Sequence, residues 1–98
     1  MKPSPEKRDK TRFRQEAAIM FEDYPSGKYY AGRMVNYSRG GMYFESDFAP
    51  GIGTEIFIGI ENFPQTSSHE VYRAKVIWHK ELADTGSLFF YGIGVKYF

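Results

Sequence analysis

Two arginines four residues apart, Arg8 and Arg12, lie near the N-terminus, with Lys7 before them and Arg14 just after. A guanidinium group is a planar fork of donors that binds a phosphate through two hydrogen bonds and stacks on an aromatic face, both of which lysine does poorly. Taken alone, such a charged run is equally typical of a solvated tail. If the run is a binding segment, its chemistry favours a phosphorylated purine.

A second polar cluster runs from Asn36 to Gly41, between two stretches with strand-like alternation. In an extended chain Asn36 and Ser38 fall on the same face, side by side, as two short hydrogen-bonding groups. Gly40 and Gly41 permit a positive φ and allow a ligand or another strand to approach the backbone closely. Asn, Ser and Gly also dominate ordinary turns, so the plain alternative is a polar hairpin connection.

The composition limits the class of protein. The chain has 98 residues, 18% of them aromatic, and no cysteine. This length predicts a single domain, and the aromatic content argues against a disordered chain. Without cysteine there is no disulfide, thiolate metal site or cysteine nucleophile. No apolar run is long enough to span a membrane, so we expect a cytoplasmic protein without membrane insertion.

The charge is distributed unevenly along the chain. Residues 1–14 hold six Lys or Arg and two acids, whereas the remainder holds seven and ten. A short basic arm on a mildly acidic body favours a small anionic ligand over a nucleic acid polymer, which needs a broad basic face. A single-stranded RNA or DNA binder is the alternative, because aromatics on a β-surface can stack bases. Most Tyr and Phe residues alternate as core faces should, which favours packing instead.

The hydrophobic pattern predicts one arm and one domain. Residues 1–15 show no apolar periodicity and are expected to form a flexible basic arm. Residues 16–98 follow a period of two, which is typical of strands. Six strands are expected, over residues 17–22, 28–38, 41–46, 54–61, 70–80 and 88–98. Short strands joined mostly by turns favour an all-β antiparallel barrel or sandwich, and a closed barrel leaves no exposed edge.

Two of these expected strands carry further detail. Alternation over residues 70–80 gives one apolar face, made of Tyr72, Ala74, Val76 and Trp78. We therefore expect Trp78 to be largely buried. In the last strand Gly92 and Gly94 share a face, which indicates strong coiling or close packing against a neighbour.

Together these residues resemble the PilZ domain, a bacterial receptor for the second messenger cyclic di-GMP. Members carry an RxxxR motif in an N-terminal arm, matched by Arg8 and Arg12, and a [D/N]xSxxG motif on the barrel, matched by Asn36, Ser38 and Gly41. An Arg-Ala-Lys-Val-Ile-Trp strand and a closing Tyr-Gly-Ile-Gly-Val-Lys-Tyr-Phe segment also follow the family pattern. The resemblance covers roughly residues 6 to 98. It implies a six-stranded antiparallel PilZ-type β-barrel whose arm folds over a ligand on the outer surface.

The resemblance also implies roles for the motif residues. Arg8 and Arg12 would bind the phosphates and guanine faces of cyclic di-GMP. Asn36 and Ser38 would hydrogen-bond a guanine edge, and Gly41 would give the turn room.

Three further basic residues, Lys7, Arg14 and Arg39, are weaker candidates for the same site. A basic residue at the position of Lys7 favours binding of two stacked ligands. Many members have Asp where this chain has Asn36, and an amide recognises the guanine edge differently from a carboxylate, so a weaker affinity is expected.

The function expected from the resemblance is that of a stand-alone cyclic di-GMP receptor in motility or biofilm regulation. It would order its arm over the ligand and present a changed surface to an unidentified effector protein. The alternative is a PilZ-like adaptor for motility or pilus machinery that binds no nucleotide, although the retained arginines favour the receptor. An enzyme is least favoured, because His69 and His79 show no spacing typical of a catalytic triad or metal site, and no cofactor is expected.

Overall fold

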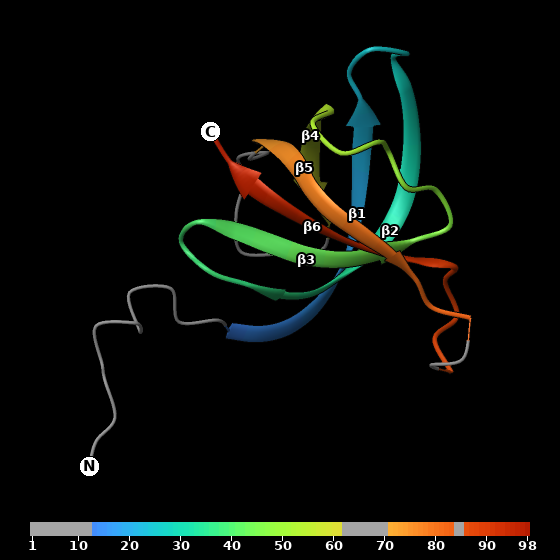
Figure 1. The fold of residues 1–98 in the computed structure, drawn as a ribbon. Coiled ribbons are helices and arrows are strands. Elements are labelled where there is room, and N and C mark those ends of the chain that lie inside the picture. Colours follow the sequence, from blue (N-terminus) through green and yellow to red (C-terminus); the bar gives the residue numbers. More distant parts are fainter. Residues whose placement is uncertain (1–12, 62–70, 84–85) are drawn as a thin grey trace.

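The computed structural model describes residues 13–61, 71–83 and 86–98, with the backbone alone for residues 13–15. Within these ranges the chain forms six strands and no helix (Figure 1). The strands are β1 (Phe13–Asp23), β2 (Lys28–Tyr37), β3 (Gly41–Ser46), β4 (Glu55–Ile60), β5 (Val71–Glu81) and β6 (Tyr91–Tyr97). The all-β class predicted from the period of two is confirmed.

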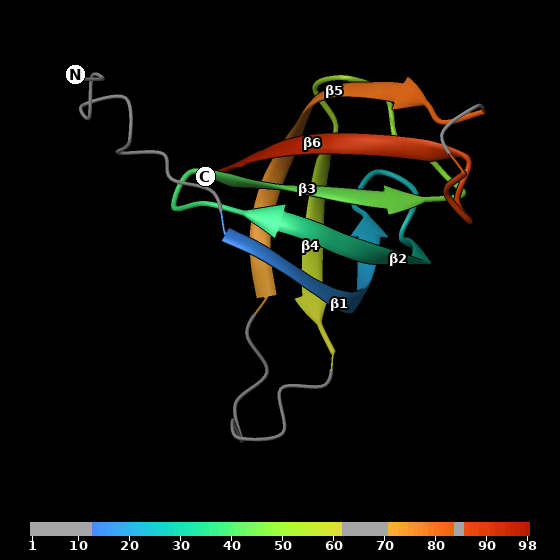
Figure 2. The same cartoon turned by 90° about the horizontal axis from the view of Figure 1, so that it is seen from below.

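The strands close into a barrel in the order β1-β2-β3-β6-β5-β4, and every neighbouring pair is antiparallel. Closure depends on β1, which pairs with β2 along one side and with β4 along the other. Figure 2 shows β3 and β6 side by side across the middle of one wall. The barrel is therefore correct and the sandwich alternative is not, and the barrel leaves no long edge open to pairing with other chains.

Alternate side chains of all six strands point inward and form one core. Its buried members are apolar: Ile19, Phe21, Met34, Met42, Phe44, Ile56, Ile58, Ala74, Val76, Ile93 and Val95. Phe21 and Phe44 meet at its centre, with ring centroids 5.1 Å apart. Burial of this apolar surface is the main force that holds the strands in register.

The β1–β2 connection is a tight turn over residues 24–27. The N–H of Gly27 donates to the carbonyl of Asp23 at 2.7 Å, and Gly27 adopts a φ of 73°. Glycine suits this position because a side chain would be strained at a positive φ.

Strand β1 begins earlier than the first strand expected over residues 17–22. Phe13 pairs with Tyr37 and Arg14 pairs with Asn36, ahead of an irregularity between Arg14 and Ala17. Backbone pairing does not require apolar periodicity, so the pattern could not reveal this extension. As a result the chain enters the barrel beside the end of β2, where the polar motif lies (Figure 2).

The expected burial of Trp78 is wrong. A bulge in β5 shifts the register with β6 between Val76 and Trp78, so the inward alternation stops after Val76. Trp78 consequently lies on the outside of the barrel, with 37% of its surface exposed.

The last strand is shorter than expected, because residues 88–90 bend before β6 begins at Tyr91. Side-chain acceptors hold this bend: the N–H of Phe89 donates to Ser87 Oγ at 3.1 Å, and that of Phe90 donates to Asp47 Oδ1 at 3.1 Å. Among the described residues no helix is long and apolar enough to cross a membrane.

Candidate functional site

The polar motif forms a tight connection at the end of β2. The N–H of Ser38 donates to the carbonyl of Gly41 at 2.9 Å, and the N–H of Gly40 donates to Ser38 Oγ at 3.3 Å. The N–H of Tyr97 in β6 donates to the carbonyl of Gly40 at 2.9 Å, which ties the connection to the neighbouring strand. Ser38 is only 5% exposed, and its hydroxyl oxygen stabilises the turn by accepting from Gly40.

Gly41 is required by a close approach of two strands. A Cβ at this position would collide with the carbonyl oxygen of Val95 in β6. The expectation that another strand approaches here is confirmed. The positive φ that glycine would permit is not used at Gly41, since the described glycines with a positive φ are Gly27, Gly53 and Gly86.

Asn36 lies on the outside of the barrel, opposite Tyr43 of β3. It lines a shallow pocket of about 260 Å³ together with Tyr43, Trp78 and Lys80. These four residues come from β2, β3 and β5, which places a motif residue beside an aromatic pair that the sequence reasoning had not included in the site.

The aromatic pair is a flat surface built on two glycines. The rings of Tyr43 and Trp78 are stacked, with centroids 5.5 Å apart and planes 19° apart. A Cβ at Gly92 would come within 2.8 Å of Tyr43 Cε1, and one at Gly94 would come within 2.7 Å of Trp78 Cζ2. The rings therefore lie directly on the backbone of β6. We call Tyr43 and Trp78 the aromatic shelf.

A cation borders the aromatic shelf. Lys80 Nζ lies 5.8 Å from the centroid of the Tyr43 ring and 5.8 Å from that of the Trp78 ring. An ammonium at this distance is attracted to the ring faces, and it can also contact an anion bound above them. The pocket thus combines a stacking surface, an amide and a positive charge.

Glu45 holds one half of the shelf in place. Tyr43 Oη donates to Glu45 Oε2 at 3.3 Å, while Glu45 Oε1 accepts from Arg33 Nη2 at 3.1 Å and from Ser87 Oγ at 2.8 Å. Partial burial first, and then the charge and hydrogen bond of Glu45, raise the pKa of Tyr43 above its ordinary value. The phenol therefore remains a neutral hydrogen-bond donor across the physiological pH range.

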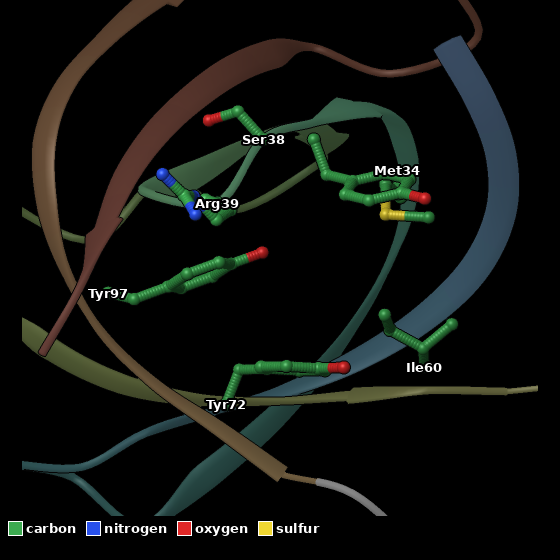
Figure 3. Close-up of a pocket in the computed structure, with 7 residues that line it drawn as sticks. Met34, Ser38, Arg39, Ile60, Tyr72 and Tyr97 are labelled. Carbon is green, nitrogen blue, oxygen red and sulfur yellow. The ribbon is translucent and has the colours of Figure 1, made fainter. Parts of the chain in front are cut away.

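A second pocket opens at the end of the barrel where β2, β4 and β6 finish (Figure 3). Its volume is about 330 Å³, and its lining is largely apolar and aromatic: Met34, Tyr37, Ser38, Arg39, Ile60, Tyr72 and Tyr97. Ser38 and Asn36 thus line different pockets, although the sequence pattern placed them side by side. Alternation fails here because the register shifts between Met34 and Asn36 and the strand ends at Tyr37.

Comparison with known families decides what kind of barrel this is. The family model described as PilZ domain matches residues 6–98. The chain belongs to the PilZ domain family. No curated protein matches it significantly. PilZ domains are binding and adaptor domains that respond to cyclic di-GMP or join effector proteins. The family therefore supports a binding function.

The basic site candidates of this PilZ domain lie at the N-terminal end of the chain and in the β2–β3 connection. Lys7, Arg8 and Arg12 lie outside the described residues. Arg14 belongs to β1, where its backbone pairs with Asn36. Arg39 is exposed in the β2–β3 connection and borders the barrel-end pocket.

The sequence held one signal that could have revealed the aromatic shelf. Gly92 and Gly94 lie two apart on one face of a strand, and such a pair leaves room for rings from a neighbouring strand. The close packing expected there is confirmed, although its partners were not identified. In the described part of this PilZ domain, no group of three metal-ligating side chains converges.

Proposed function

We propose that this PilZ domain is a receptor for cyclic di-GMP that binds the ligand on the outer face of the barrel. The observation that carries the proposal is the pocket in which Asn36 of the family motif lies beside the aromatic shelf and Lys80. A purine needs a flat face to stack on, a polar group at its edge and a cation near its phosphate. This pocket offers all three.

The aromatic shelf would provide most of the base-binding energy. Stacking of one nucleobase on an aromatic side chain contributes about 1–3 kcal/mol. Trp78 is exposed enough to receive a base on its outer face, while its inner face rests on Gly94. Asn36 would recognise the guanine edge, since its amide offers both a carbonyl acceptor and N–H donors.

The N-terminal arm would complete the site by covering the ligand bound on the aromatic shelf. The chain enters β1 at Phe13, opposite Tyr37, and therefore one residue from Asn36 in the neighbouring strand. Arg8 and Arg12 are five residues or fewer from this entry point, and each residue of an extended chain spans about 3.3 Å. They are thus tethered within reach of a ligand on the shelf. Their guanidinium groups would bind its phosphates and cover its exposed guanine face.

Isothermal titration calorimetry with cyclic di-GMP tests this proposal, with GTP and cyclic di-AMP as controls. We expect selective binding at roughly micromolar strength or tighter, about −8 kcal/mol. The stoichiometry would decide whether one ligand or two are bound. An absence of heat at two temperatures would contradict the receptor, because a binding enthalpy is rarely zero at both.

A nucleotide-independent adaptor is the second candidate, and one surface favours it. Leu88 and Phe90 are 85% and 67% exposed, at the bend that precedes β6. The bend is fixed by Ser87 and Asp47, so the two apolar side chains are held outward. Exposed apolar groups in a fixed position are typical of protein contacts. Absence of cyclic di-GMP binding would make this candidate the preferred one.

A further inference from the structure

Two lysines face each other across β5 and β6. Lys75 and Lys96 are register partners, and both are exposed. Side chains at directly opposite positions of antiparallel strands have Cβ atoms about 4.5–5.5 Å apart, and like charges placed there destabilise the sheet. Such a pair calls for an explanation.

Within the described residues the neighbouring strands place one carboxylate directly opposite this lysine pair. On β3 the partner of Lys96 is Gly41, which has no side chain. On β4 the partner of Lys75 is Glu55, but its Oε2 accepts a hydrogen bond from Arg73 Nε. One carboxylate therefore lies among three cations, and it is engaged by Arg73.

The lysine pair lies next to the aromatic shelf along β5 and β6, with Lys75 Nζ 6.0 Å from the centroid of the Phe98 ring. Along β6 the outward positions are Gly92, Gly94 and Lys96, and Trp78 covers Gly94. Two residues of a strand span about 6.6 Å, so the backbone of Lys96 lies about that far from the backbone of Gly94, on which the indole packs. Lys80 lies against the same two rings on the side of Gly92. The shelf is thus bordered by positive charge at both ends.

We propose that Lys75 and Lys96 form a phosphate-binding pair for the nucleotide stacked on the aromatic shelf, acting separately from the arginines of the arm. The inference rests on the proposed function and adds the barrel's own contribution to phosphate recognition. A cyclic dinucleotide carries two phosphates on opposite sides of its ring. One would lie near Lys75 and Lys96 while the other meets the arm or Lys80. A bound phosphate would also relieve the repulsion between the two ammonium groups.

Charge-neutral variants test the pair directly. Calorimetry with cyclic di-GMP should show about fivefold weaker binding for Lys75→Gln and for Lys96→Gln at low salt, the scale of one lost charged contact. The matched control is Lys28→Gln, which removes the same charge from the start of β2, at the other end of the barrel. The control should bind like the wild type. The salt dependence of binding should weaken in the two variants and stay unchanged in the control.

The outcomes separate this inference from the proposed function. If the wild type binds cyclic di-GMP and both variants bind equally well, the lysine pair is refuted and the receptor stands. If the wild type does not bind, both proposals fall.

The ligand-free protein gives a second readout. Lys96→Gln should raise the melting temperature at low salt and lose this advantage at high salt, because screening removes the repulsion. An unchanged melting temperature at low salt would mean that the charges of Lys75 and Lys96 are already compensated. That result would contradict the proposed phosphate-binding pair.

Discussion

Trp78 is the residue on which the proposed base-binding surface depends. Its indole is stacked with Tyr43, it packs against the backbone at Gly94, and 37% of the residue's surface is exposed. Replacing it by alanine removes the stacking surface, so cyclic di-GMP binding should weaken by about 1–3 kcal/mol. Trp78→Phe keeps a ring and should lose less. Calorimetry on both variants checks this, with circular dichroism to show that the barrel remains folded. Equal affinity of Trp78→Ala and the wild type would place the ligand elsewhere.

Tyr43 links stability to pH. Its pKa is raised in the folded protein, by partial burial first and then by Glu45. An unfolded tyrosine loses its proton near its ordinary value of 10.0, whereas the folded one keeps it to higher pH. The folded state therefore binds more protons in that range. The stabilising contribution of Tyr43 is complete below about pH 10 and declines as the pH rises through the raised pKa.

Tyr43→Phe isolates this effect, since other tyrosines cancel in the comparison. Urea unfolding at about pH 8 and about pH 11 should show the advantage of the wild type over Tyr43→Phe shrinking at the higher pH. A difference in unfolding free energy that stays constant between the two would show that the hydroxyl does not titrate as described.

At the scale of elements, β6 supports the shelf through its glycines. A Cβ at Gly94 would overlap the Trp78 indole, so Gly94→Ala must displace that ring. We expect weaker cyclic di-GMP binding and a red-shifted Trp78 emission, because the indole becomes more exposed. The control is Gly59→Ala in β4, where the nearest atom to the new Cβ is the carbonyl oxygen of Met20, at 3.9 Å. Identical emission and affinity in Gly94→Ala and the wild type would refute the supporting role of β6.

Sequence reasoning succeeded where a strand is regular and failed where it is not. The alternation of Met42 and Phe44, or of Ile56 and Ile58, reports which side chains face the core, and the structure buries all four. A bulge adds one residue without any compositional mark. Ile77 is as apolar as its neighbours, so nothing in the sequence showed that Trp78 would face outward.

The motif residues show the same limit. Asn36, Ser38 and Gly41 were identified by type and spacing, and the structure places them at one connection. The direction in which their side chains point depends on where β2 ends and on its register shift. A two-residue hydrophobic alternation predicts neither of these. Trp78 and Lys80, two of the residues that share a pocket with Asn36, come from β5, which is distant in the sequence.

At the scale of the whole molecule, the proposed site is divided between the barrel, which carries the shelf, and the arm, which would supply Arg8 and Arg12. Charged arginine side chains are almost never buried in a core, so Arg8→Ala and Arg12→Ala should each weaken cyclic di-GMP binding by about 2 kcal/mol or more and leave the melting temperature unchanged. Lys10→Ala, in the same arm, is the matched control and should bind almost normally. Unaltered affinity in either arginine variant, measured by calorimetry, would remove the arm from the site.

The central claim is that cyclic di-GMP binds on the aromatic shelf, and the only tryptophan of the chain is part of that shelf. The most direct measurement is a titration of the protein with cyclic di-GMP while Trp78 fluorescence is recorded, with free tryptophan amide as the optical control. We predict a saturable quenching of the Trp78 emission, with a midpoint equal to the calorimetric affinity. Calorimetric binding without any change in Trp78 emission would contradict the account.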